Sequence, residues 1–262
     1  MTTIPAEARA RVEAALDAIA VDDAVRIPIA IESGSRAWGF PSPDSDYDAR
    51  FIYLRAPERY LRLERDRDVI EREITGDLDV NGWDLGKALR LILKSNAVVL
   101  EWLQSPIRYR DHPELRAALL EFAERALDRR ALTWHYLRLA DGARKAAGDG
   151  QEVKLKKLFY ALRPALALTW LEQRTDPPPM QIGALMSGLE LPQGLQDETD
   201  ALIARKARTR ELGTAPAPQT IVAFVRDALE QAAARTSEPR DRTQPDLREE
   251  AEDIFRHWVY AV

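Results

Sequence analysis

The chain has 262 residues, 45% of them hydrophobic, which is enough for one large globular domain or two modest ones. Its formal net charge of −5 at pH 7 excludes a global basic field, so nucleic acid would have to be bound through a local patch. The absence of cysteine excludes disulfides, thiolate catalysis and cysteine metal sites, and it fits a reducing compartment.

The amino-terminal segment predicts a packing helix over residues 6–20. Val12, Leu16 and Ile19 belong to an apolar stripe at helical spacing, and Pro5 suits a first helical turn. No basic stretch followed by an apolar one comes before this helix, and no apolar run approaches the length that spans a membrane. We therefore expect a soluble, cytoplasmic protein that does not enter a membrane.

The pattern then changes to short strands. They are predicted at 26–31, 48–54, 68–73 and 77–83. Helices are predicted to follow at 84–94 and 97–104. Beyond residue 106 strand signals nearly vanish, and helical stripes take over at about 112–126, 129–147, 153–173, 181–187, 196–211 and 217–235.

A polar loop at 236–245 leads to a last amphipathic helix that carries Ile254, Trp258 and Val259. The order of elements predicts the α+β class. We expect a small mixed-sheet domain over residues 1–108 and a helical domain over residues 109–262.

The most informative stretch joins the first two strands. Gly34 and Ser35 follow an apolar strand, and Asp46 and Asp48 stand about ten residues later at the head of the next one. A glycine lets the backbone approach a phosphate, and successive N–H groups that open a helix form a concavity for anions. Side chains two apart on a strand point the same way, so the two carboxylates can share divalent cations. This order predicts a site for a nucleoside triphosphate and magnesium.

A third carboxylate is expected from a neighbouring strand. The segment 77–84 alternates so that Asp77, Asp79 and Asn81 share one face. We favour Asp79 as the third metal ligand, against the alternative of a solvated strand carboxylate. Asp84 stands where the next helix begins, so an N-cap role is favoured for it. The choice between Asp79 and Asp84 stays open from the sequence.

Three further side chains near the motif have two interpretations each. Arg36 can contact phosphate oxygens or pair with a nearby carboxylate. Trp38 can stack on a nucleobase, although a place in the core is at least as well supported. Arg50 lies on the aspartate face by parity, where balancing the acidic cluster is favoured over a catalytic role.

A second candidate cluster lies in the helical half. Lys154, Lys157, Tyr160 and Arg163 recur at about helical spacing and are predicted to share a stripe. A solvated face is the usual explanation of such a charge run, but an aligned tyrosine is less typical of one. The functional hypothesis is that Lys154, Lys157 and Tyr160 bind nucleotide phosphates or the acceptor.

These residues together resemble a known superfamily. Gly34-Ser35, Gly39 and the segment 45–48 resemble the signature of the polymerase-beta-type nucleotidyltransferases. A longer pattern resembles the RNA-ligase-associated, or RNA-repair-pathway, branch of that superfamily. It comprises residues 79–84, Lys87, 95–96, 101–106, Lys154, Lys157, Tyr160 and 163–164, within a resemblance that covers most of residues 25–190.

The resemblance implies a magnesium-dependent nucleotidyltransferase domain. Asp46, Asp48 and Asp79 would be the metal triad, and Gly34 and Ser35 would contact the triphosphate. Two metal ions are expected, Mg²⁺ or Mn²⁺ in its place.

The leading hypothesis is therefore an enzyme that moves a nucleoside monophosphate from an NTP, such as ATP, to a hydroxyl and releases pyrophosphate. RNA and DNA ends, proteins and small molecules all stay open as acceptors, and the sequence identifies no protein partner. The alternative is a nucleotide-binding or partner-binding regulator that retains the fold but turns over little. The intact aspartates, Asp46, Asp48 and Asp79, favour the enzyme.

Overall fold

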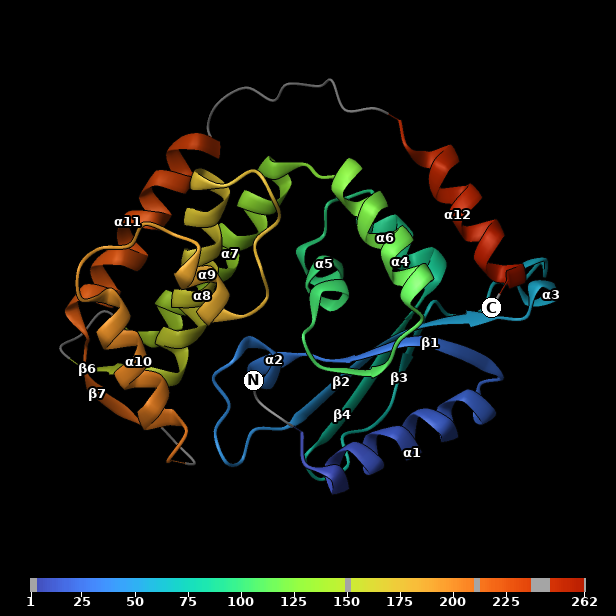
Figure 1. Cartoon of the computed structure of the whole chain (residues 1–262), viewed down its shortest axis with the longest axis horizontal. Helices are drawn as coiled ribbons and strands as arrows, with labels where there is room; N and C mark the ends of the chain where they lie inside the picture. Colours follow the sequence, from blue (N-terminus) through green and yellow to red (C-terminus); the bar gives the residue numbers. More distant parts are fainter. Residues whose placement is uncertain (1–3, 149–151, 210–212, 237–245, 262) are drawn as a thin grey trace. The chain divides into compact units, whose positions relative to one another are not determined.

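The computed structural model describes residues 4–148, 152–209, 213–236 and 246–261, and these form two compact units (Figure 1). The first unit takes its described residues from 1–37, 45–127 and 244–262, and the second takes them from 38–44 and 128–243. A mixed sheet in the first unit and helices in the second confirm the predicted α+β class. The predicted domain boundary between residues 108 and 109 stays a prediction, because compactness does not show which parts fold independently.

The first unit is built on a five-stranded sheet of order β3-β4-β2-β1-β5. Its strands are β1 (Val25–Glu32), β2 (Tyr47–Arg55), β3 (Val69–Glu71), β4 (Leu78–Asp84) and β5 (Arg108–Arg110). Strand β2 pairs in parallel with β4, whereas the other neighbours are antiparallel. Its helices are α1 (Ala6–Asp22), α2 (Gly34–Trp38), α3 (Pro57–Tyr60), α4 (Leu85–Ile92), α5 (Ala97–Gln104), α6 (Pro113–Arg125) and α12 (Arg248–Ala261), with Trp38 of α2 assigned to the second unit.

Alternation along β2 sorts its side chains between the two faces of the sheet. Ala49, Phe51 and Tyr53 join the apolar cluster that includes Val12 and Leu16 of α1. Positions between them point to the opposite face, on the side of α4 and α5 (Figure 1). Asp48 and Arg50 therefore lie on the face of β2 opposite Ala49 and Phe51, on the side of α4 and α5.

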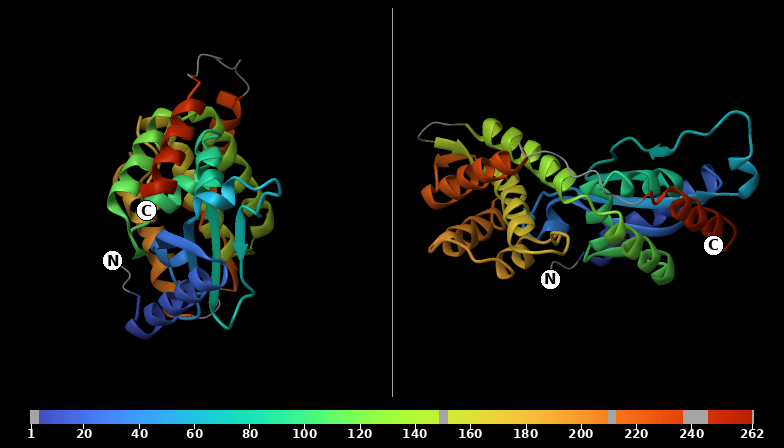
Figure 2. Two further views of the ribbon diagram at one scale, coloured as in Figure 1. Left: turned by 90° about the vertical axis from the view of Figure 1, so that its right-hand side faces the viewer. Right: turned by 90° about the horizontal axis from the view of Figure 1, so that it is seen from above.

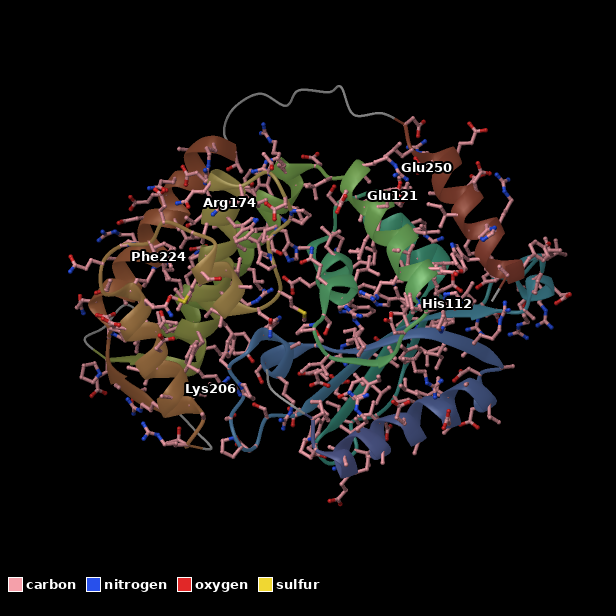
Figure 3. The ribbon with its side chains drawn as sticks, in the orientation of Figure 1. His112, Glu121, Arg174, Lys206, Phe224 and Glu250 are labelled. Atoms are coloured by element: carbon pink, nitrogen blue, oxygen red, sulfur yellow. The ribbon has the colours of Figure 1, made fainter. Side chains whose placement is uncertain are left out.

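The carboxy-terminal helix α12 returns to this first unit. Arg125 at the end of α6 donates hydrogen bonds to Glu121 on its own helix and to Glu250 on α12 (Figure 3). The ring of Phe255 stands edge-on to Tyr60, with ring centroids 5.0 Å apart. Figures 1 and 2 show α12 and α3 at the same end of the unit.

The second unit is a helical bundle centred on α8 (Leu155–Gln173), which is buried along most of its length. The other helices are α7 (Arg129–Ala147), α9 (Ile182–Ser187), α10 (Leu195–Lys206) and α11 (Gln219–Thr236), and β6 (Glu152–Lys154) pairs with β7 (Thr214–Pro216). Segment 38–44 packs within this unit, where Phe40 stacks on Phe159 with ring centroids 4.9 Å apart.

Most of the predicted elements are confirmed, with ends that differ by a few residues. The sequence did not predict α2, α3, β5, β6 or β7, because elements of three to five residues are too short to display a period. Except for Thr236 at the end of α11, the predicted polar loop at 236–245 lies outside the described residues.

Lys206 in α10 is a charged side chain placed among aromatic rings. It is only 3% exposed, and its Nζ lies 4.6 Å from the ring centroid of Phe40 and 5.7 Å from that of Phe159 (Figure 3). Burial, together with the nearby Lys156, lowers the pKa of Lys206 from 10.5 to about 8, while Asp44 has the opposite effect. The ring faces attract the ammonium and so offset part of the desolvation cost.

Lys206→Met is expected to remove a pH dependence of stability. Between about pH 8 and 10.5 the unfolded chain binds a proton at Lys206 that the folded chain has released, so wild-type stability rises with pH in this window. The difference in unfolding free energy, Lys206→Met minus wild type, should therefore fall by on the order of 1 kcal/mol between pH 7.5 and pH 9.5. Urea unfolding of both proteins at the two pH values measures the difference, and an unchanged difference would contradict the lowered pKa.

Candidate active site

The residues of the Gly34–Asp48 motif lie at one end of the sheet, where β1 leads into α2 and β2 begins. The backbone N–H of Ser33 donates to the carbonyl of Asp48 at 2.8 Å. The Ser35 hydroxyl donates to the Ser45 hydroxyl at 3.0 Å. These bonds tie the two halves of the motif together across the intervening loop.

Gly34 has a conformation and an environment that exclude a side chain. Its φ of +60° lies in the left-handed region, which L side chains rarely adopt. A Cβ built at this position would lie 2.0 Å from Oδ2 of Asp48. Glycine therefore lets the Asp48 carboxylate pack directly against the backbone of the turn.

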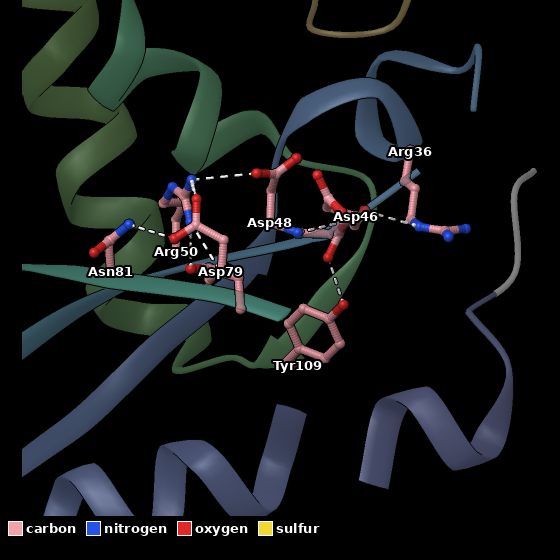
Figure 4. A network of polar contacts seen from close by, with 9 residues as sticks. Arg36, Asp46, Asp48, Arg50, Asp79, Asn81 and Tyr109 are labelled. Carbon is pink, nitrogen blue, oxygen red and sulfur yellow. Dashed lines mark hydrogen bonds and ion pairs between the residues drawn. The ribbon is translucent and has the colours of Figure 1, made fainter. Parts of the chain in front are cut away.

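Parallel pairing of β2 with β4 places Asp48 opposite Asp79. Arg50 joins the two carboxylates, because its Nη2 donates to Oδ1 of Asp48 at 3.3 Å and to Oδ2 of Asp79 at 2.7 Å (Figure 4). The side-chain amide of Asn81 donates to the other oxygen of Asp79 at 2.7 Å. The favoured interpretation of Arg50, that it balances the acidic cluster, agrees with this geometry.

Asp46 and Arg36 occupy the loop that precedes β2. The Asp46 side chain is exposed, and its backbone carbonyl accepts a hydrogen bond of 3.1 Å from Nε of Arg36. Arg36 also donates to the carbonyl of Ser45 at 2.5 Å, and its guanidinium lies 4.0 Å from the ring centroid of Tyr47. Arg36 thus holds loop carbonyls, and no carboxylate partner of this side chain is seen in the described part of the chain.

The charges around Asp48 oppose one another. Burial raises the pKa of Asp48, and the neighbouring Asp79 and Asp46 carboxylates act in the same direction. Arg50 and Arg36 lower that pKa. A cation that approaches Asp48 and Asp79 would therefore be stabilised by both carboxylates.

The other candidates for the third carboxylate lie elsewhere. Asp84 accepts from the backbone N–H of Gly86 at 2.8 Å and from the Tyr60 hydroxyl at 2.7 Å, which confirms its N-cap role. It lies five residues along the strand from Asp79, about 17 Å away at the rise of a β-strand. Asp77 precedes β4 and pairs with Arg11 of α1. Asp79 is therefore the candidate that the fold brings beside Asp48.

Sequence reasoning missed Glu32, whose carboxylate is hydrogen-bonded to the backbone of Asp48. Glu32 is 0% exposed, and its carboxylate accepts from the backbone N–H of Asp48 at 3.1 Å and from the Tyr109 hydroxyl at 2.5 Å. Burial raises the pKa of Glu32 to about 7. The signal was an acidic residue that ends an apolar run directly before the Gly34 turn, but nothing in the sequence points to Tyr109 as its partner.

Glu32→Leu is expected to destabilise the protein more than Glu32→Gln. Leucine leaves two buried donors, the Asp48 N–H and the Tyr109 hydroxyl, without an acceptor, at a cost of about 1–3 kcal/mol each. Glutamine keeps an oxygen for one donor, and the Tyr109 hydroxyl can rotate to accept from its amide. Urea unfolding measures both variants, and equal losses would contradict a role in hydrogen bonding.

The candidate residues of the helical unit do not form the single stripe that their spacing predicted. Lys154 lies in β6, directly before α8, and is exposed together with Lys157. Tyr160 is half-buried, edge-on to Trp38 with ring centroids 5.6 Å apart. Arg163 is buried and donates to the carbonyl of Met180 at 2.9 Å. The helix is buried on several sides, so helical spacing alone did not define an exposed face.

The site carries the donor atoms that a hard divalent cation prefers. Asp48 and Asp79 both face one cationic nitrogen of Arg50, so a positive charge fits between their oxygens. Carboxylate oxygens suit Mg²⁺ and Mn²⁺. Within the described ranges, no group of three or more acidic, histidine or cysteine side chains is already gathered as a metal site. The donor atoms of this site therefore suit a divalent cation. In this structure Arg50 contacts two of the three predicted ligands, Asp48 and Asp79.

Among the helices in the described ranges, none has the length and apolar character to cross a membrane.

A sequence model of the RlaP family, the RNA repair pathway DNA polymerase beta family, matches residues 8–257. The uncharacterized protein YcgL of Bacillus subtilis (strain 168) is 44% identical over 206 residues, which are 79% of this chain and 79% of the relative. The family match confirms the resemblance to the RNA-repair-pathway branch of the polymerase-beta-type superfamily.

Proposed function

Because the chain belongs to the RNA repair pathway DNA polymerase beta family, we propose that it is a magnesium-dependent nucleotidyltransferase. It would move a nucleoside monophosphate from an NTP to a hydroxyl acceptor and release pyrophosphate. Family membership suggests a polymerase-beta-like nucleotidyltransferase. The observation that supports the proposal most is the pairing of Asp48 with Asp79 across parallel strands, with the Asp48 carboxylate against the Gly34 turn.

The reaction joins the acceptor oxygen to the α-phosphorus of the NTP. The bond from that phosphorus to the oxygen bridging to the β-phosphate breaks, and pyrophosphate leaves with the bonding electrons. Asp46, Asp48 and Asp79 would hold Mg²⁺, or Mn²⁺ in its place, which would neutralise phosphate charge when bound. Asp79 would favour loss of the acceptor's proton to solvent as the new bond forms, a role supported by the position of its carboxylate beside that of Asp48.

The chain's other residues would position the triphosphate. Gly34 leaves room beside Asp48, and Ser35 offers a hydroxyl at the same turn. Arg36 holds the loop between Ser35 and Asp46 through two carbonyls, which keeps the turn and the aspartates in register. Arg50 also donates to the carbonyls of Ala49 and Asp79, at 3.0 and 2.9 Å, so it stays anchored if its carboxylate contacts are exchanged.

Lys154, Lys157 and Tyr160 are proposed as nucleotide-binding residues of the helical unit. The two lysines are exposed, and Nζ of Lys157 lies 6.0 Å from the ring centroid of Tyr160. The indole Nε1 of Trp38, next to Tyr160, is buried and has no hydrogen-bond partner in the described part of the chain. A cationic and aromatic surface of this kind suits a nucleotide's phosphates and base.

We propose a nucleic-acid end as the acceptor, because the family is described as part of an RNA repair pathway. The net charge of −5 disfavours long-duplex binding more than recognition of a short end. The base of the NTP and the choice of RNA or DNA are left to experiment.

The proposal is tested by incubating the protein with Mg²⁺ and each α-labelled NTP, with RNA, DNA and the protein itself offered as acceptors. We expect label to move to one acceptor, and removal of divalent cations with EDTA to abolish the transfer. Label that stays in free nucleotide under every condition, although NTP still binds, would contradict the proposal.

One observation favours a second candidate, a nucleotide-binding or partner-binding regulator with little turnover. The guanidinium of Arg50 already neutralises the carboxylates of Asp48 and Asp79, which is the role that a metal ion would have in an active transferase. In that case asparagine substitutions at the aspartates would leave partner binding unchanged, and no transfer would be seen with any acceptor.

A further inference from the structure

A large cavity lies in the first unit, away from the Gly34–Asp48 motif. Its volume is about 1110 Å³, and it is lined by the segment after β2, one side of α4 and the beginning of α12. Strands β2 and β4 run in parallel from the paired aspartates to Arg55 and Asp84, and these two residues line the cavity. Five to seven residues of strand separate the two places, about 17–23 Å. Carboxyl ends of parallel strands are common places for ligand crevices in α/β sheets.

The cavity has an apolar and aromatic wall. Leu89, Leu93 and Leu247 line it together with Tyr60 and Phe255, whose rings meet edge to face. Such a wall suits a flat, weakly polar body such as a nucleobase.

The acidic groups of the lining already have partners. Asp66 pairs with Arg59 at 2.6 Å, and Asp68 pairs with Arg90 at 2.8 Å. Arg90 and Lys87 hold the pKa of Asp68 below its usual range, against the opposing effect of burial. Asp84 is held by Tyr60 and the helix N-terminus, and Asp246 and Glu252 have arginine partners within 3.9 Å on α12.

Two cations of the lining have no acidic partner in the described ranges. They are Arg65, in the loop after α3, and Lys94, just past the end of α4. Both are exposed, so neither needs a partner for stability, and both are available to an anion. The chain as a whole has a net charge of −5, so these free cations do not follow from a generally basic surface.

We propose that this cavity binds a nucleoside phosphate, either as a free nucleotide or as the phosphorylated end of an oligonucleotide. Arg65 and Lys94 contact the phosphate, and the wall that contains Tyr60 and Phe255 accommodates the base. The inference does not rest on the proposed transferase function, because it uses no residue of the Gly34–Asp48 motif. It adds a second nucleotide site at the far end of β2 and β4.

The experiment is isothermal titration calorimetry of the whole protein with AMP in EDTA. Without a divalent cation the aspartates repel phosphate, so binding in EDTA does not report on the Gly34–Asp48 motif. The Arg65 and Lys94 variants then separate the cavity from Lys154 and Lys157 of the helical unit. We expect saturable binding, weakened at least about fivefold in Arg65→Glu and in Lys94→Glu. The matched control is Arg62→Glu, which makes the same charge change in the same loop at an exposed residue that does not line the cavity. Its affinity should equal that of the wild type.

Further probes separate the sources of the phosphate. A 5′-phosphorylated tetranucleotide that binds more tightly than AMP would identify a strand end, and the reverse would identify a free nucleotide. Adenosine and inorganic phosphate should each bind more weakly, because each lacks half of the contacts.

Three results would overturn the inference. The first is no saturable binding of AMP or of the phosphorylated tetranucleotide. The second is equal weakening in Arg62→Glu and Arg65→Glu, and the third is binding that Asp48→Asn alters but Arg65→Glu does not. Transfer assays on Arg65→Glu report separately on the proposed function, so the two failures are distinguishable.

Discussion

Asp48→Asn is expected to reduce nucleotidyl transfer by about 1,000-fold while the protein stays folded. The substitution keeps the size of the side chain but removes the charge that, with Asp79, would hold a divalent cation on the triphosphate. Asparagine can still accept from Arg50, and the backbone bond to Glu32 is unaffected. The loss should therefore appear in transfer rate and in the Mg²⁺ dependence, with little change in the urea midpoint.

Asp77→Asn is the matched control for this prediction. Asp77 is a carboxylate that directly precedes β4, the strand of Asp79, but it is half-exposed and pairs with Arg11 at the surface. Its substitution should leave transfer within about twofold of wild type, because surface ion pairs contribute about 0–1 kcal/mol. Equal effects of the two substitutions, or full activity in Asp48→Asn, would contradict the assignment of Asp48 as a metal ligand.

Gly34→Ala is expected to reduce transfer by about 100-fold or more and to destabilise the protein. The new Cβ would meet Oδ2 of Asp48 at 2.0 Å, so the carboxylate or the turn must move. Displacing a catalytic group by about 1 Å is enough for a loss of this size. The positive φ adds a backbone cost of about 1 kcal/mol.

Gly76→Ala separates the two contributions. Gly76 has a similar φ of +66°, but nothing lies within 4 Å of a Cβ built there. This variant should lose about 1 kcal/mol of stability and keep its activity. Urea unfolding and transfer rates of both variants give the comparison. If Gly34→Ala behaved like Gly76→Ala in both measurements, close packing of Asp48 on the turn would not matter for activity.

The sequence predicted the motif, because its chemistry lies in local spacing. Parity along a strand placed Arg50 on the aspartate face and Asn81 beside Asp79, and the structure confirms both. The position of a helix start predicted the N-cap role of Asp84. The contact of Asp48 with Asp79 depended on which strands pair, and only the structure shows that β2 and β4 are neighbours.

Other features depended on contacts between distant residues. Glu32 accepts a hydrogen bond from Tyr109, 77 residues later in the sequence, and helical or strand periodicity does not predict such a pair. Arg163 has the spacing of an exposed stripe, yet its guanidinium lies against Trp38, 5.0 Å from the ring centroid. Segment 38–44 lies inside the motif in sequence but packs in the helical unit, so the division of the chain into compact units could not be read from sequence order.

The measurement that tests the account most directly is the ratio of pyrophosphate released to nucleotide transferred. It uses wild-type protein, Mg²⁺, one NTP labelled at the α-phosphate and the acceptor identified by the labelling screen. Nucleotidyl transfer predicts one pyrophosphate for each label joined to the acceptor, with both products lost in Asp48→Asn. Release of inorganic phosphate in place of pyrophosphate, or pyrophosphate without label on the acceptor, would contradict the account.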